Sequence, residues 1–353
     1  MRTGRSLPSR LAHYTLWTIA ALALLIALVL AAFRFQATLR ETREAAELAP
    51  PGGRYVHAGD VDVFIQEAGP RNGTLVLFMH GTGAWSETWR ESMQNLADAG
   101  FRAVALDLPP FGLSSRPASA LYAKTDQAQR IIAVLDALDA REAILVGHSF
   151  GGGPTVEATL RAPQRVKGLV LVDAALSIAS EGETPQPPGM LTSAVLAMPP
   201  LRDALVATFL TNPAFTRRLL QAFIDDPARA TDDRVAIYQQ PLEVRGTTRA
   251  VGEWLPELID PHAPAASESP ASYRMLTMPV VAIWGARDTI TPLAQGERLV
   301  KLVPQARLVV MPDVGHIPQI ENPAAFQRVL RDAVRGVSDA ADKRPRTKPR
   351  ALP

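Results

Sequence analysis

The chain has no cysteine among its 353 residues. This absence excludes disulfides, thiolate metal sites and a cysteine nucleophile. An excess of charge is also missing, because 37 Lys and Arg residues face 35 Asp and Glu residues, a net charge of +2. A body so nearly neutral gives no electrostatic reason to expect a nucleic-acid partner. The apolar fraction of 47% is ordinary for a globular protein with one large domain or two smaller ones.

Asp, Glu, Lys and Arg are missing altogether from residues 11–33. A helix needs about 20 apolar residues to cross the hydrocarbon core of a bilayer. We therefore predict a short tail at 1–13 and a transmembrane helix at 14–33, with Tyr14 and Trp17 in the headgroup region. A cleaved signal peptide and a buried core helix are the two alternatives for this segment.

Lys and Arg residues, which set the orientation of a membrane helix, are balanced around this segment. Three arginines precede it and three follow it: Arg2, Arg5, Arg10, Arg34, Arg40 and Arg43. Because the tail before the helix is very short, we expect a single-pass membrane protein with its N-terminus in the cytoplasm. The body would then lie outside, in the periplasm or the extracellular space.

The two flanks of the body differ from it in composition. Residues 34–53 are charged and end in Pro50-Pro51-Gly52-Gly53, which predicts a linker. Residues 336–353 carry basic residues and prolines with little apolar content, which predicts a disordered tail. The domain between these flanks covers residues 54–335.

Apolar runs typical of buried strands recur through this domain. They occupy residues 75–79, 103–106, 144–146, 169–172, 280–284 and 308–311, and residues 61–65 alternate like a half-exposed strand. Helical patterns separate several of these runs, which predicts an α/β fold with a mostly parallel sheet covered by helices on both faces. The interval from about 176 to 273 has no strand pattern, and we predict that it forms a helical cap.

The sequence Gly147-His148-Ser149-Phe150-Gly151 fits the pattern G-x-S-x-G between a buried strand and a helix. A sharp strand-to-helix turn holds such a serine in a strained conformation with its hydroxyl exposed. The glycines are needed because neighbouring backbone crowds the turn, and the following helix directs its N-terminal N–H groups toward the site. We therefore predict that Ser149 is a nucleophile.

A serine hydroxyl needs a base, and the base needs an acid that orients it. Of the six histidines, His316 follows the last strand, where a loop at the strand end can reach Ser149. Asp288 follows the preceding strand and completes the chain order Ser, Asp, His. Asp173 also ends a strand and is the rival for the acid. The predicted triad is Ser149, Asp288 and His316.

Two backbone N–H groups should stabilise the negative charge that develops on the substrate's carbonyl oxygen. One belongs to Phe150, directly after the nucleophile, and the other to Thr82 in His80-Gly81-Thr82-Gly83. Trp85 after this loop and His148 beside the nucleophile are candidate substrate-binding residues. Apolar residues in the cap favour a lipophilic pocket.

The domain at 54–335 resembles the α/β-hydrolase family. The matching pieces occur in the family order: His80 to Gly83, Asp107-Leu108-Pro109-Pro110-Phe111-Gly112-Leu113-Ser114, Gly147 to Gly151, Asp288-Thr289-Ile290-Thr291-Pro292 and Gly315-His316. The resemblance implies an eight-stranded sheet, a cap inserted after the sixth strand, and no cofactor; no metal site is expected. The serine nucleophile argues against the branches with an aspartate nucleophile. The loop at His80 is similar to that of the carbon–carbon bond hydrolases.

Together these features predict a serine hydrolase that cleaves a carboxylic ester of a small or lipophilic substrate through an acyl-enzyme intermediate. Hydrolysis of a carbon–carbon bond by the same fold is the alternative within this class. A non-catalytic, membrane-anchored binding protein is the alternative from another class. The expected partners are a small ester-type molecule and a membrane, without nucleic acid. The sequence does not indicate an oligomeric state.

Overall fold

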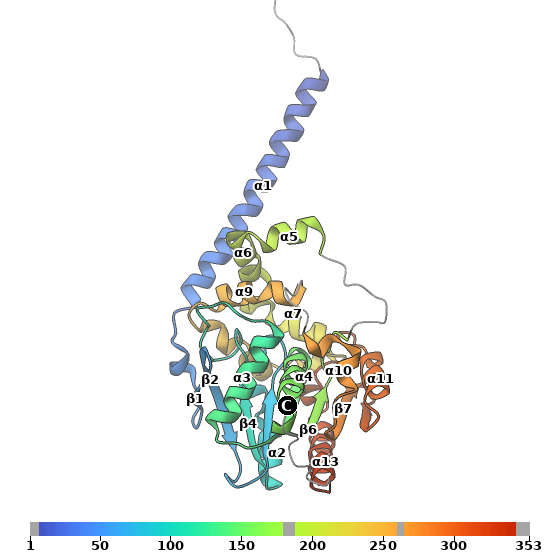
Figure 1. Cartoon of the computed structure of the whole chain (residues 1–353). Helices are drawn as coiled ribbons and strands as arrows, with labels where there is room; N and C mark the ends of the chain where they lie inside the picture. Colours follow the sequence, from blue (N-terminus) through green and yellow to red (C-terminus); the bar gives the residue numbers. More distant parts are fainter. Residues whose placement is uncertain (1–6, 179–187, 260–264, 344–353) are drawn as a thin grey trace, which may run out of the picture.

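A computed structural model describes residues 7–178, 188–259 and 265–343 (Figure 1). Its centre is one sheet of eight strands in the order β1-β2-β4-β3-β5-β6-β7-β8. The strands are β1 (Arg54–Ala58), β2 (Val61–Ala68), β3 (Leu75–Met79), β4 (Arg102–Leu106), β5 (Ala143–His148), β6 (Val166–Val172), β7 (Val280–Gly285) and β8 (Ala306–Met311). Only the pairs β1–β2 and β2–β4 are antiparallel, so the prediction of a mostly parallel eight-stranded sheet is confirmed.

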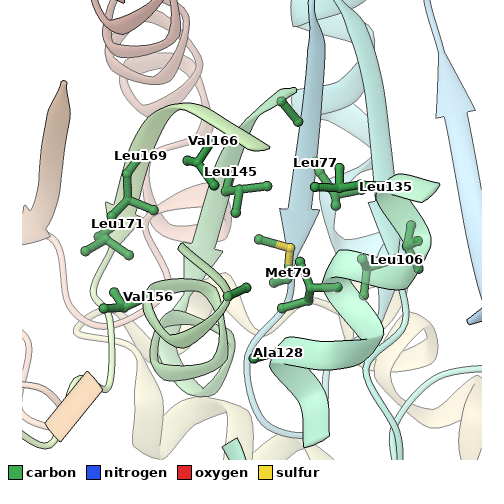
Figure 2. Packing of buried hydrophobic residues seen from close by; sticks show 14 of the residues in the cluster. Leu77, Met79, Leu106, Ala128, Leu135, Leu145, Val156, Val166, Leu169 and Leu171 are labelled. Atoms are coloured by element: carbon green, nitrogen blue, oxygen red, sulfur yellow. The ribbon is translucent and has the colours of Figure 1, made fainter. Parts of the chain in front are cut away.

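Helices cover both faces of the sheet because successive strand residues point to opposite sides. On one face, α3 (Lys124–Ala137), α4 (Gly152–Arg161) and α11 (Leu293–Leu302) pack on the strands. Figure 2 shows this core, in which Leu77 and Leu145 of the strands, Leu135 of α3 and Val156 of α4 belong to one cluster. On the other face, α2 (Arg90–Asp98) and α13 (Pro323–Asp342) pack on the alternate residues of the same strands.

The cap follows β6, as predicted, and no strand occurs among its described residues. Its helices are α5 (Met190–Leu196), α6 (Pro199–Phe209), α7 (Pro213–Phe223), α8 (Asp232–Gln239) and α9 (Thr247–Ile259), and α10 (Pro270–Tyr273) leads back to the sheet. Part of the predicted interval, residues 179–187 and 260–264, lies outside the described residues. The cap therefore lies at the carboxyl ends of the parallel strands, where ligands bind in open α/β sheets.

The N-terminal helix α1 (Leu7–Arg40) is longer than the sequence analysis predicts. It continues past position 34 to Arg40, which corrects the expected start of the linker. The physical reason is tertiary packing: Ala37 is fully buried, and the carboxylate of Glu41 accepts hydrogen bonds from the backbone N–H and the hydroxyl of Thr248 in the cap. The helix is thus docked on the cap, and a 3-10 turn, η1 (Ala45–Leu48), follows it.

The C-terminal boundary also differs from the prediction. Helix α13 ends at Asp342, so residues 336–342, expected to belong to a disordered tail, are helical. Val337 is 1% exposed and packs against β6 at Gly168, where a side chain would collide with it. Tertiary packing therefore extends the helix beyond its apolar sequence pattern. Residues 344–353 lie outside the described residues. The short helix α12 (Pro318–Glu321) precedes α13 and follows the loop that carries His316.

Candidate active site

The nucleophile turn has the geometry that its sequence pattern indicates. Strand β5 ends at His148, and Ser149 has a φ of +49°, in the left-handed region that costs energy for a residue other than glycine. A Cβ at Gly147 would lie 2.6 Å from Thr155 Oγ1, and one at Gly151 would lie 2.6 Å from the carbonyl oxygen of His80. Glycine at both positions is therefore a packing requirement of the turn.

The three predicted triad residues form one line of hydrogen bonds. His316 Nε2 lies 2.7 Å from Ser149 Oγ, and His316 Nδ1 lies 2.8 Å from Asp288 Oδ2. All three side chains are nearly buried, with Ser149 and Asp288 6% exposed and His316 1% exposed. The hydroxyl can donate to Nε2 while Nδ1–H donates to the carboxylate, which is the arrangement that activates a serine.

Asp288 is held in its charged form by its neighbours. Burial raises the pKa of this carboxyl, but hydrogen bonds from His316 and from Thr291 outweigh it and hold the pKa below its usual value. Asp288 Oδ1 accepts from the backbone N–H groups of Ile290 and Thr291, at 2.8 and 2.9 Å. Thr291 Oγ1 lies 2.6 Å from Oδ2, so both carboxylate oxygens are fixed.

Asp173, the rival acid, lies behind Asp288 and does not reach the histidine. Its Oδ1 accepts from the backbone N–H of Gly285 at 2.8 Å, and its Oδ2 is buried without a hydrogen-bond partner among the described residues. Burial, and then the charge of Asp288, raise the pKa of Asp173 well above its usual value. Asp173 is therefore protonated where Asp288 is charged, and of the two acids Asp288 is the one that contacts His316.

His148 lies beside the nucleophile but faces the loop of the base. Its Nε2–H donates to the backbone carbonyl of His316 at 2.9 Å, and its ring meets Trp89 edge to face. Burial, and then the neighbouring His316 ring, lower the pKa of His148 to about 3. His148 lines the cavity described below, as expected for a substrate-binding candidate, but it is only 3% exposed.

Glu321, which the sequence analysis missed, holds the loop that carries His316. Glu321 accepts hydrogen bonds from the backbone N–H groups of Gly315 and Ile317, on either side of His316, at 3.0 and 3.1 Å. His80 spans the other loop: its Nδ1–H donates to the carbonyl of Gly81 and its Nε2 accepts from the N–H of Leu108, both at 2.8 Å. The position of Glu321 five residues after the base is too weak a signal to identify it from sequence.

The predicted oxyanion residues lie on the two segments that meet at Ser149. A Cβ at Gly81 would lie 3.0 Å from Ser149 Cβ, so the loop that carries Thr82 runs directly against the nucleophile. Thr82 lines the cavity. The side chain of Phe150 points away and packs between Phe111 and Trp254, with ring centroids 5.7 and 5.5 Å apart. Phe150 therefore offers only its backbone to a substrate.

A cavity of about 260 Å³ lies between the sheet and the cap. Ser149 and His316 line it, and most of its other walls are apolar: Pro110, Phe111, Leu210, Leu219, Leu220, Phe223, Leu242, Val251, Trp254, Leu255, Leu258 and Ile317. The expectation of substrate contact at Trp85 is corrected, because this side chain is outside the cavity lining and fully buried among Phe64, Leu113 and Val244. Its Nε1–H donates to the carbonyl of Ile237.

Arg116 gives the cavity lining its one permanently charged side chain among the described residues. The guanidinium donates to the backbone carbonyls of Ser114 and Gly112 and to Thr247 Oγ1, while its Nε is buried without a partner among the described residues. Burial lowers the pKa of Arg116. No group of three or more His, Asp or Glu residues in the described part of the chain could hold a metal ion.

The model of the α/β hydrolase fold family matches residues 74–323. The chain is 30% identical to 2-hydroxymuconate semialdehyde hydrolase of Pseudomonas sp. (strain CF600), over 84% of this chain and 99% of that protein. It is 27% identical to 2-hydroxy-6-oxo-2,4-heptadienoate hydrolase of Pseudomonas putida, over 79% of this chain and 95% of that protein.

Two solved structures resemble the chain in fold. A meta-cleavage product hydrolase matches with a TM-score of 0.65 and 26% identity, over 80% of this chain and 98% of that one. A membrane phospholipase A matches with a TM-score of 0.64 and 23% identity, over 95% of this chain and 100% of that one. The second match shows likeness of fold alone, but it covers more of this chain than the first.

Proposed function

Because the chain belongs to the α/β-hydrolase family, we propose that it is a serine hydrolase with Ser149, His316 and Asp288 as its catalytic triad. The observation that carries the proposal is the hydrogen-bonded line from Ser149 Oγ through His316 to Asp288 Oδ2, at 2.7 and 2.8 Å. Its serine end opens on the cavity. A non-catalytic binding protein would have no need of such a line, so this alternative is the weaker one.

In this proposal, Ser149 Oγ attacks a substrate carbonyl carbon while His316 Nε2 takes the hydroxyl proton. The carbonyl oxygen becomes negative and is stabilised by the backbone N–H groups of Phe150 and Thr82, each contributing roughly 100-fold or more to the rate. Asp288 stabilises the imidazolium that forms. His316 then returns the proton to the leaving group, and water releases the acyl group from Ser149 by the same route in reverse.

We infer that the bond cleaved is a carbon–carbon bond next to a carbonyl group. Both relatives compared above are, by name, hydrolases of unsaturated six- and seven-carbon acids that carry an aldehyde or a ketone, which favours this reading over ester hydrolysis. The electron pair of the broken bond stays on the leaving carbon, so the substrate must be conjugated to spread that charge, and the proton from His316 neutralises it. Such substrates carry a carboxylate, and Arg116 is the cation in the cavity lining that suits one.

Hydrolysis of a lipophilic ester is the second candidate. The walls of the cavity are largely apolar, which suits an acyl chain as well as a dienone. One solved structure that resembles this chain in fold over 95% of its length is that of a membrane phospholipase A. The attack by Ser149 is the same for both candidates, and only the leaving group differs: an alkoxide oxygen takes the proton in place of carbon.

The two candidates are separated by assaying one enzyme on matched substrates. A 2-hydroxy-6-oxo-dienoate loses its conjugated absorbance on cleavage, and p-nitrophenyl esters of short and long acyl chains release a coloured phenol. We expect turnover of the dienoate to exceed that of the esters in kcat/KM, with neither cleaved by Ser149→Ala. Arg116→Met should raise KM for the dienoate and leave KM for a neutral ester unchanged. Faster turnover of the esters would reverse the order of the candidates.

We also propose that α1 anchors the protein in a membrane as a single span, with the N-terminus in the cytoplasm and the hydrolase body outside. In support, residues Ala12–Arg40 are long and apolar enough to cross a bilayer, and the apolar window is not buried against the body. The hydrolase domain at 54–335, with its cap at 176–273, would then follow directly. Mass spectrometry of the mature protein tests cleavage, and a C-terminal reporter active only in the cytoplasm would refute this orientation.

A further inference from the structure

The segment that forms α5 and leads into α6 is exposed although it carries no charged side chain. From Pro188 to Leu201 there is no Asp, Glu, Lys or Arg. Met190 is 90% exposed and Leu191 is 79% exposed. Helices α5 and α6 meet at 93°, and together they have the length and composition of a membrane-inserted segment. A contiguous exposed apolar surface of this kind marks an interaction site.

Helix α6 lies along the part of α1 nearest the body. On α1, the side chains that are partly or fully buried lie three or four residues apart on one face of the helix, at Leu30, Phe33, Arg34, Ala37 and Arg40. The cap helix α6 contacts α1. Leu30 and Phe33 belong to the uncharged run at 11–33, so the cap reaches the end of the apolar part of α1 (Figure 1).

The hydrogen bonds at the other end give the direction of α6. Just after α6, the hydroxyl of Thr211 lies 2.7 Å from the hydroxyl of Thr248, which in turn bonds Glu41 at the end of α1. The C-terminal end of α6 therefore lies near Glu41, and α6 is about 16 Å long, at a rise of about 1.5 Å per residue over its 11 residues. Because α6 packs on α1, α5 lies at the opposite end of α6 from Glu41, on the side of the uncharged run (Figure 1).

The cavity reaches the surface of the cap through apolar residues. Leu210 and Leu258 line the cavity and are still 40% and 56% exposed. Each has an exposed apolar neighbour in the chain, Phe209 at 51% and Ile259 at 41%. These residues stand at the ends of α6 and α9, two helices that pack on each other. An apolar molecule therefore finds apolar surface from the outside of the cap to the cavity.

We propose that residues 188–201, which form α5 and the start of α6, lie in the interfacial region of the bilayer that α1 crosses, so that lipophilic substrates enter the cavity from the lipid leaflet. The proposal rests on the membrane anchor and the serine hydrolase activity proposed above. The occupant of the exposed surface is lipid, because the surface is continuous with a helix whose uncharged run is long enough to span a bilayer. An uncharged helix lying flat at this depth buries its apolar side chains as interfacial helices do.

Since the natural chain has no cysteine, single cysteines in the full-length protein can be labelled without background. An environment-sensitive fluorophore is attached to one of three single-cysteine variants in phosphatidylcholine vesicles: Leu191→Cys, Leu24→Cys or Met275→Cys. Met275, an apolar residue that is 66% exposed, serves as the matched control. We expect doxyl-labelled lipid to quench the fluorophores at positions 24 and 191, and aqueous iodide to quench the one at 275. Quenching at 191 by iodide alone would overturn the proposal.

The same labels separate this proposal from its alternatives. Lack of lipid quenching at position 24 as well would refute the anchor and the proposal together. If the surface instead covered a second copy, the fluorophore at 191 would be protected in detergent in a concentration-dependent way, and lipid would not quench it. Quenching by lipid at 191 with no hydrolysis of any substrate would refute the proposed function and uphold the membrane contact.

The rate at which Ser149 is labelled tests substrate entry without assuming which bond the enzyme cleaves. Fluorophosphonates label any activated serine, so a long-chain probe held in vesicles and a short water-soluble probe report access to Ser149 alone. In the variant Met190→Glu with Leu191→Glu, we expect labelling by the vesicle-borne probe to slow about tenfold, since two charges oppose burial at the interface. Labelling by the soluble probe should not change, and Met275→Glu should change neither. Equal rates with both probes would refute entry from the leaflet.

Discussion

His148 Nε2 lies 2.9 Å from the backbone carbonyl oxygen of His316, so the residue before the nucleophile holds the loop that carries the base. This hydrogen bond joins the end of strand β5 to the loop that follows β8. The bond requires a proton on Nε2. Burial, followed by the effect of His316, lowers the pKa of His148 to about 3, so the ring is neutral and carries its single proton on Nε2. The alignment of His316 with Ser149 therefore depends on a residue that the G-x-S-x-G pattern leaves unspecified.

Replacing His148 tests this relationship. In His148→Leu the carbonyl of His316 loses its donor and the base is less well aligned, so we expect kcat to fall about 10- to 100-fold. KM should change less, because the ring is only 3% exposed to the cavity. His148→Gln, which can still donate to the carbonyl, should recover part of the activity. Steady-state kinetics of both variants give the comparison, and equal losses in the two would argue against a role for the hydrogen bond.

The two buried aspartates should differ sharply in their effect on catalysis. Asp288→Asn removes the charge that stabilises the imidazolium and should lower kcat by about 10⁴-fold. Asp173→Asn replaces a carboxyl that its buried site already holds protonated, and the amide oxygen can still accept from Gly285, so activity should stay within about threefold. Comparison of kcat/KM for the pair is the measurement. A large loss in Asp173→Asn with a small one in Asp288→Asn would exchange their roles.

Two buried neutral histidines should make the fold sensitive to acid. Burial lowers the pKa of His80 to about 4 and that of His148 to about 3, below the usual value of about 6.5. Below that value the unfolded chain binds protons that the folded chain does not, so each histidine should cost about 2 kcal/mol of unfolding free energy between pH 7.5 and pH 5. Stability should therefore fall as the pH falls through this window.

Denaturant unfolding of the soluble body at the two pH values measures this loss. His148→Gln carries no titrating ring at that position and should lose about 2 kcal/mol less stability on acidification than the natural chain. Asp107, also buried, has a pKa raised to about 6 by its burial, which acts with the opposite sign and favours the folded state at low pH. An unchanged pH dependence in His148→Gln would mean that the ring titrates normally.

Substitution of Trp85 should lower stability, whereas substitution of Trp254 should change substrate binding. Trp85 is fully buried outside the cavity, and Trp85→Phe removes the hydrogen bond to the carbonyl of Ile237, so we expect a loss of about 1–2 kcal/mol in unfolding free energy with KM unchanged. Trp254 lines the cavity and packs on Phe111 at 4.9 Å between ring centroids, so Trp254→Phe should change KM several-fold. A change in KM at Trp85→Phe would restore its predicted role in binding.

Much of the fold could be predicted because the signals are local. A strand buried on both faces needs an apolar run, and Leu75 to Met79 or Ile144 to Val146 are such runs. The turn at Ser149 needs residues without a side chain where the backbone is crowded, and the glycines at 147 and 151 are the sequence signal of that requirement. Asp288 and His316 could be chosen because carboxyl ends of parallel strands meet at one edge of the sheet.

The incorrect expectations concern side chains whose surroundings come from distant parts of the chain. Trp85 follows the oxyanion loop by three residues, yet it turns into a cluster with Phe64 and Val244. The end of α1 was predicted from the first charge, Arg34, although Ala37 and Glu41 find partners in the cap some 200 residues later. A helix boundary set by such contacts leaves no periodic mark in its own sequence.

The sequence by itself determined the strand runs of β2 to β8, the nucleophile turn and the uncharged N-terminal run, because each depends on residues close together in the chain; it did not mark β1. The tertiary structure alone decided that Asp288 and not Asp173 contacts His316, and that α1 docks on α6. It also decided that His148 donates a hydrogen bond to the backbone of the loop that carries His316. These outcomes depend on contacts between residues 28 to more than 200 positions apart, which form only when the sheet and the cap have been assembled.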